Sequence, residues 1–317
     1  MDNIRPLPPS HFSFVEGSVI RETTNKKKAM DTDRAAGAEV ITKALQKHGF
    51  LTRALIARSL MAHKHKTIDL VKSLRKMQQQ GEVRKYTIET GTGDDLCVFC
   101  LSEDMRIEYP DKGVFRYDMT DIPYILSHLS TAQWEIAVQG SGGVWEHMYE
   151  GYTSVNGKAL HIPSLLRFNY EPGKYMFLVA LPSCRDRDPM ALRSFLTHVN
   201  SIHRYLTDLY GKYRSVQIII ICESVRQIED MCRLFSRISE LAGIYFLYTT
   251  DAITADPGIP PLTMLYGADI LDDGSVELSL YSLKEKTVRE YAHMAVDTVR
   301  ERGKELIENL KEGGIPV

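Results

Sequence analysis

Residues 46–60 read QKHGFLTRALIARSL, and residues 74–86 read LRKMQQQGEVRKY. Apolar side chains recur at helical spacing in both stretches, and Gly49 and Gly81 stand where helices end. Thr52 occupies an N-cap position, because its hydroxyl is free to accept from the next helical turn. Outward from these stretches, the pattern predicts helices over 35–48, after Thr52 and over 67–80, then strands over 83–88 and 96–101.

Three short helices followed by a β-hairpin form the order of a winged helix-turn-helix. In the third helix Leu70, Val71, Leu74 and Met77 repeat at helical spacing and predict a buried face. The opposite face is polar and basic. Such a helix suits the major groove of DNA, with the hairpin against the flanking phosphates.

Charge is concentrated in the same part of the chain. Residues 34–88 contain twelve Lys or Arg and three acids, a balance of +9, whereas the whole chain has a formal charge of −2 and the remainder therefore −11. A local excess of this kind indicates a polyanionic partner. We therefore expect double-stranded DNA to be the partner, since phosphate neutralisation supplies most non-specific affinity. The expected contacts in the groove are Lys66, Thr67, Lys72, Ser73 and Lys76. Arg53 and Arg58 are expected to contact the DNA backbone from the second helix, and Arg84 and Lys85 from the base of the wing.

The rest of the chain predicts a second domain of α/β type. Strand-like segments come first and then alternate with helices, and residues 216–222 form the continuous apolar run of a strand buried on both faces. This order predicts a mixed sheet. The predicted organisation is a flexible arm over 1–33, a winged helix over 34–104, a connector over 105–130, an α/β domain over 131–280, and a C-terminal helix and tail over 281–317.

The element order resembles the replication-relaxation family of plasmid and conjugative-element proteins. Besides the two stretches quoted first, the matching segments are AQWEIAV (132–138), ALHIPSLLRF (159–168), YMFLVALPS (175–183) and VQIIIICES (216–224). The resemblance implies a winged helix joined to a restriction-endonuclease-like domain of the PD-(D/E)XK type. It also implies accessory work in replication, transfer or transcription of a mobile element, with a relaxase or a replication initiator as a candidate protein partner.

Nuclease chemistry in that family requires carboxylates on two adjacent strands to hold Mg²⁺. The corresponding positions here read Pro163-Ser164 and Ala180-Leu181-Pro182, which offer no carboxylate. Glu135 is the one acid in a family-like position. We therefore expect a nuclease-like domain without catalysis, used for assembly. The alternative is an active Mg²⁺-dependent nuclease with relocated acids, namely Glu135, Asp186 and Asp188.

Other chemistry is not indicated. The five cysteines are scattered, and the Cys97–Cys100 spacing on a strand favours core residues over a metal site. Gly140 to Gly143 lacks the lysine of a phosphate loop, so we expect no cofactor. No stretch reaches the roughly twenty apolar residues of a membrane span. We expect a cytoplasmic protein. The C-terminal helix leaves open whether it packs on its own domain or forms the seam of a homodimer, and a third possibility for the whole chain is a protein–protein adaptor for a relaxase or a replication initiator.

Overall fold

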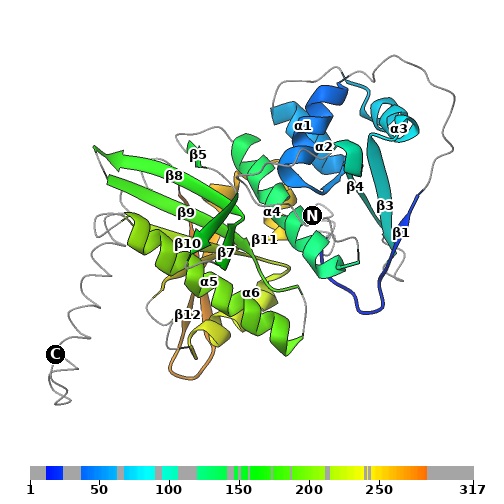
Figure 1. Cartoon of the computed structure of the whole chain (residues 1–317). Helices are drawn as coiled ribbons and strands as arrows, with labels where there is room; N and C mark the ends of the chain where they lie inside the picture. The colour runs from blue at the N-terminus through cyan, green and yellow to red at the C-terminus, as the bar shows by residue number, and fades with distance from the viewer. Residues whose placement is uncertain are drawn as a thin grey trace, which may run out of the picture.

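The computed structural model of the chain is a mixed α/β structure (Figure 1). It describes residues 12–23, 37–62, 68–89, 95–105, 120–140, 146–148, 151–155, 158–172, 174–185, 188–210, 215–238, 241 and 244–283. The predicted C-terminal helix over 281–317 lies outside these residues from position 284 onward.

The N-terminal module, residues 37–105, contains three helices and two longer strands at the predicted places. Its helices and strands are α1 (Ala38–His48), β2 (Leu51–Thr52), α2 (Arg53–Ala62), α3 (Leu70–Gln80), β3 (Val83–Glu89), β4 (Leu96–Leu101) and the single turn η1 (Glu103–Met105). The short strand β2 pairs antiparallel with β4, and β4 pairs antiparallel with β3. The three helices therefore lie against a small antiparallel sheet (Figure 1).

Helix α3 begins and ends through local chemistry. The carboxylate of Asp69 accepts from the backbone N–H of Lys72 at 3.2 Å, which satisfies a donor of the first turn. Gly81 follows the helix with φ of 78°, a left-handed conformation that glycine adopts without steric cost. The helix was predicted to start at Thr67, but this cap places its first residue at Leu70.

The predicted flexible arm is partly wrong. Residues 19–22 form strand β1 (Val19–Glu22), which pairs antiparallel with β3 so that Ile20 lies opposite Ile88. The side chain of Phe12 is only 2% exposed and belongs to the core of the N-terminal module. Burying one aromatic ring and adding a strand to an open edge offsets the ordering entropy of these residues.

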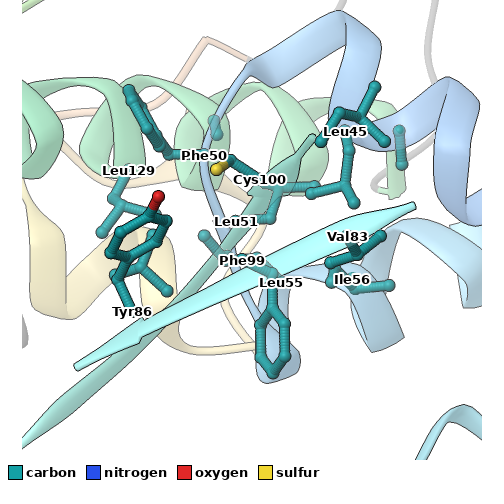
Figure 2. Close-up of a cluster of buried hydrophobic side chains, with 14 of the residues drawn as sticks. Leu45, Phe50, Leu51, Leu55, Ile56, Val83, Tyr86, Phe99, Cys100 and Leu129 are labelled. Carbon is teal, nitrogen blue, oxygen red and sulfur yellow. The ribbon is translucent and has the colours of Figure 1, made fainter. Parts of the chain in front are cut away.

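The predicted boundary between residues 130 and 131 falls inside a helix. Helix α4 (Ile122–Gly140) is continuous, and Figure 1 shows it between the N-terminal module and the larger sheet. One face of the helix, from Ile122 to Ile136 and including Leu129, packs into the core of the N-terminal module (Figure 2), whereas Trp134 and Val138 pack on the larger sheet. Because one helix supplies side chains to both cores, residues 122–130 of the predicted connector and the start of the second domain are a single structural element.

The second domain is built on a mixed seven-stranded sheet, as predicted. The strand order is β13-β12-β11-β10-β9-β8-β5; β9, β10 and β11 are parallel, and the remaining neighbours are antiparallel. The strands are β5 (Glu146–Met148), β8 (Ser164–Glu171), β9 (Lys174–Pro182), β10 (Ser215–Cys222), β11 (Phe246–Thr250), β12 (Leu265–Ile270) and β13 (Val276–Tyr281). The remaining elements are the hairpin β6 (Gly151–Val155) and β7 (Lys158–Ile162), helices α5 (Pro189–Tyr210), α6 (Val225–Phe235) and α7 (Asp251–Ala255), and the turn η2 (Pro261–Thr263).

Strand β10 explains why helices cover both faces of the seven-stranded sheet. Its four consecutive isoleucines, 218 to 221, are all 0% exposed. Ile218 and Ile220 pack with α5 and α6 on one face, and Ile219 and Ile221 pack with Trp134 of α4 on the other. Successive side chains of a strand point to opposite faces, so an uninterrupted apolar run requires cover on both. The prediction of a doubly buried strand is confirmed.

All five cysteines are free thiols, and Cys100 is buried as expected for a core residue of β4. A search of the helices among the described residues found none with the length and apolar character needed to cross a bilayer.

Candidate nucleic-acid interface

The outward face of α3 is open to solvent. Val71, Lys72 and Arg75 are exposed, and Lys76 is half-buried at the edge of the same face. Lys72 Nζ lies 3.4 Å from the Asp69 carboxylate, but its side chain remains 86% exposed, so this is a surface ion pair of small energy. Figure 1 shows α3 on the side of the N-terminal module away from the seven-stranded sheet. The predicted contacts Lys66 and Thr67 lie outside the described residues.

Two residues of α3 face opposite to their predicted direction. Ser73 was expected in the groove, but it is 4% exposed and packs inward beside Leu74. Val71 was expected in the core and is 58% exposed. The apolar spacing of α3 fits two buried faces that differ by a rotation of about one residue. In the folded module the buried residues of this helix are Ser73, Leu74 and Met77. Ser73 is therefore removed from the candidate interface, and Val71 joins it.

The predicted backbone contacts Arg53, Arg84 and Lys85 come from neighbouring elements. Arg53, the first residue of α2, is exposed, and Lys85 on β3 is half-buried. Both line a groove of about 910 Å³ that also includes Asp69 and Val71 from the start of α3. Arg84 lies on the other side of β3, where its guanidinium is 4.0 Å from Glu22 and 3.8 Å from Glu103. The groove therefore brings α2, α3 and β3 together.

Arg58 has a structural role that charge alone did not reveal. Its Nη1 donates to the carbonyl oxygens of Thr254 and Ala255 at 3.0 and 3.1 Å, at the C-terminal end of α7. Burial lowers the pKa of Arg58 from its ordinary value, and Asp256 acts in the opposite direction. These bonds hold Nη1 on carbonyls of the second domain, while the residue also lines the groove shared with Arg53 and Lys85, so a DNA contact from Arg58 stays a prediction.

Glu135 is fully buried between the two parts of the chain. Its Oε2 lies 3.3 Å from Nζ of Lys47 and 3.3 Å from Nδ1 of His48, both at the end of α1. Burial raises the pKa of Glu135, and the neighbouring Lys47 and the Ser164 hydroxyl oppose that shift. The carboxylate thus holds α1 against α4. Lys47 supplies a cation at the one acid that stands in a family-like position.

The positions that correspond to the metal-binding acids of the resembled family lie side by side on two adjacent strands. Ser164, the first residue of β8, lies opposite Ala180 of β9 in the antiparallel register, and the Ser164 hydroxyl contributes to the surroundings of Glu135. Asp188 is exposed and caps α5 by accepting from the N–H of Ala191 at 3.3 Å, while Asp186 is outside the described residues. Within the described part of the chain, no three His, Cys, Asp or Glu side chains are grouped so that they could hold a metal ion.

Comparison with known proteins adds no family assignment. No family model, curated protein or solved structure matches this chain significantly.

Sequence reasoning missed a buried polar cluster at the carboxyl ends of the parallel strands. Arg185, after β9, donates from Nη1 to Oδ2 of Asp251 at 2.7 Å and from Nη2 to Oδ1 at 3.2 Å. Ser130 of α4 donates to Asp251 Oδ1 at 2.6 Å, and Gln133 donates to the Asp251 carbonyl at 2.8 Å. Arg185 was expected in a solvated loop, but it is 3% exposed.

This cluster has a clear electrostatic basis. Desolvation lowers the pKa of Arg185, but the Asp251 carboxylate more than compensates and the pKa is raised. A paired carboxylate and guanidinium with fitting donors are the form in which buried charges are tolerated. The sequence carries one weak signal, since Arg185 stands three residues after the end of the apolar strand β9 and Asp251 directly follows β11. Charged residues at strand ends are also common in exposed loops, so the signal did not distinguish the two.

A histidine beside this cluster makes stability depend on pH. Burial lowers the pKa of His128 to about 3, with a smaller contribution from His161. Between pH 6.5 and 3 the unfolded chain binds a proton that the folded chain excludes, so stability falls as pH falls. We expect His128→Gln to reduce the loss of unfolding free energy between pH 7 and 5 by about 2 kcal/mol. Urea unfolding at both pH values measures this, and an unchanged pH dependence contradicts it.

Proposed function

We propose that this chain is a duplex DNA-binding protein whose N-terminal module is a winged helix-turn-helix. The observation that carries the proposal is the basic outer face of α3, where Lys72 and Arg75 are exposed. Figure 1 shows the helix itself on the side of the N-terminal module away from the larger sheet. A helix presented in this way is the element that enters the major groove in winged and other helix-turn-helix proteins.

The topology of the module supports the assignment. Its order is α1, β2, α2, α3, β3, β4, and the short strand β2 closes the sheet by pairing with β4. The strands β3 and β4 are the two central strands of this sheet, in the order β1-β3-β4-β2, and this pair would correspond to the wing. Its turn, 90–94, lies outside the described residues. Arg53 and Lys85 flank α3 along one groove and would contact phosphates on either side of the inserted helix.

Only part of the excess of cations in residues 34–88 stays exposed in the folded chain. Lys47 and Arg58 contact the second domain, at Glu135 and at the carbonyls of α7. Arg53, Lys72 and Arg75 remain exposed. These exposed cations support an electrostatic contribution to DNA affinity, because counterions released from phosphates drive such binding.

For the second domain we propose assembly without catalysis. The resemblance implies carboxylates at two positions on adjacent strands. Ser164 and Ala180 occupy these positions, opposite one another, and neither side chain is a ligand for Mg²⁺. Glu135, the remaining acid, is paired with Lys47. Following the resemblance, the protein acts in replication, transfer or transcription of a mobile element, where this domain would contact a second copy, a relaxase or a replication initiator.

Charge reversal on α3 tests the proposal. We expect Lys72→Glu combined with Lys76→Glu to weaken binding to duplex DNA about thirtyfold at low salt and to reduce the slope of log K against log salt by about 1.8, because two phosphate contacts are lost. Fluorescence anisotropy with a labelled duplex at several salt concentrations measures both quantities.

The matched control reverses two exposed charges elsewhere. Lys43 lies on α1 and Arg204 on α5, and both are solvent-exposed. We expect Lys43→Glu combined with Arg204→Glu to change affinity less than about threefold, because these residues contact no phosphate. Equal losses in the two double variants mean that net charge, rather than α3, governs binding, and the assignment of α3 is then rejected.

A further inference from the structure

A cavity at the carboxyl end of β9 is separate from the DNA-binding surface. Its volume is about 310 Å³, and none of its lining residues belongs to α1, α2, α3, β3 or β4. The walls come from α4, from the β7–β8 connection, from the residues after β9 and from the first turns of α5. In sheets with parallel strands, ligands bind at the carboxyl ends. At about 30 Å³ per water, the cavity has room for a ligand of about ten non-hydrogen atoms.

Flat rings make up much of the cavity wall. Tyr124 and His128 come from α4, His161 from β7, and Phe195 from α5. The rings of Tyr124 and His128 are 4.3 Å apart between centroids, and those of His128 and His161 are 6.0 Å apart. Rings from three separate elements therefore line one cavity. Such surfaces favour stacking with another ring over contact with a branched aliphatic group.

The polar groups of the cavity favour a ligand without charge. The guanidinium of Arg185 is already matched by Asp251 at 2.7 Å, so it offers no unbalanced cation. Burial lowers the pKa of His128 to about 3 and that of His161 to about 4, which keeps both rings neutral at pH 7. The carboxylate of Asp121 at the rim disfavours anions.

Hydrogen-bonding groups lie among the rings. Ser127, Thr131 and Ser183 line the cavity and present hydroxyl oxygens. Thr131 donates to the Ser127 carbonyl at 3.1 Å, and Ser183 donates to Gln227 Oε1 at 2.8 Å. The hydroxyl oxygens of Thr131 and Ser183 are thereby oriented and can still accept a hydrogen bond. A ring bearing N–H donors satisfies these acceptors, whereas a pure hydrocarbon leaves them unpaired at a cost.

We propose that this cavity binds a small, flat, uncharged heteroaromatic molecule, the chemical class to which the nucleobases belong. The ring would stack among Tyr124, His128, His161 and Phe195 and place its N–H edge toward the hydroxyls. This site is independent of DNA binding by α3, because the two surfaces share no lining residue.

Free adenine and uracil are the test probes, titrated into the full-length protein and followed by ligand-observed NMR. We expect at least one of them to bind. Cyclohexanone and benzoate should bind about tenfold more weakly, because cyclohexanone lacks a flat aromatic face and benzoate carries a charge. Phe195→Leu keeps apolar bulk but removes a ring, and should weaken binding about tenfold.

A pair of substitutions on α5 separates the cavity from the rest of the helix. Ala191 lines the cavity, so Ala191→Phe should fill it and abolish binding. Ser194 is exposed on the same helix outside the cavity, so Ser194→Phe should leave binding unchanged. Circular dichroism checks that both variants are folded. The proposal is overturned if neither base binds, if cyclohexanone binds as well as the bases, or if Ala191→Phe retains full affinity.

Discussion

Asp251→Ala is expected to lower the free energy of unfolding by about 3–5 kcal/mol, because it removes the nearer of the two carboxylates beside a buried guanidinium and leaves only Glu223, at 3.7 Å. Arg185 is wholly buried, and Asp251 supplies its closest contact, at 2.7 Å. Alanine keeps the backbone carbonyl of residue 251, so the bond from Gln133 is retained. The expected loss is thus that of the ion pair together with the hydrogen bond from Ser130, measured by urea unfolding monitored by circular dichroism.

Two comparisons make this result interpretable. The double variant Asp251→Ala with Arg185→Met removes both charges and should recover part of the loss. Asp230 is 60% exposed in a surface pair with Arg233 at 3.6 Å, so Asp230→Ala should cost less than about 1 kcal/mol. If Asp251→Ala costs no more than Asp230→Ala, the buried pair does not stabilise the second domain as argued.

Leu129→Ala is expected to cost about 2–5 kcal/mol and to destabilise the N-terminal module although residue 129 lies beyond it in sequence. Leu129 is 0% exposed and belongs to the same core as Phe50 and Tyr86 (Figure 2). Truncation leaves a cavity in that core, lined by side chains of both α4 and the module. Thermal unfolding of the variant measures the effect on Tm and on the number of transitions.

The control for this variant is Leu280→Ala on β13, where the side chain is 65% exposed and the change should stay within about 0.5 kcal/mol. Because α4 supplies side chains to the cores on both sides, we expect Leu129→Ala to lower the stability of the chain in one cooperative transition. A variant in which the second domain unfolds at its original temperature and only the N-terminal module is affected contradicts this coupling.

Sequence patterns located the helices and strands because the patterns are local. The apolar spacing of α1, α2 and α3, the glycine after α3 and the isoleucine run of β10 each report on neighbours within a few residues. The mixed sheet followed from the order of such segments. The same reasoning gave the wrong face for Ser73 and Val71, because a rotation of one position fits the apolar pattern nearly as well.

Charged residues were harder to assign than apolar ones. The basic excess of residues 34–88 is a property of composition, and it does not say which cations remain exposed. Arg58 contacts carbonyls nearly two hundred residues away, and Lys47 pairs with Glu135 on another helix. A charge reaches its partner through space, whereas a sequence pattern records only spacing along the chain.

The amino-acid sequence by itself determined the order of the elements, the doubly buried strand and the concentration of cations near the front of the chain. Only the tertiary structure decided that α4 is shared by two cores, that Arg185 and Asp251 form a buried pair, and that rings from α4, β7 and α5 line one cavity. The physical reason is the range of the interactions. Helix periodicity and capping act within a few residues, while core packing and buried ion pairs join residues that are distant in sequence.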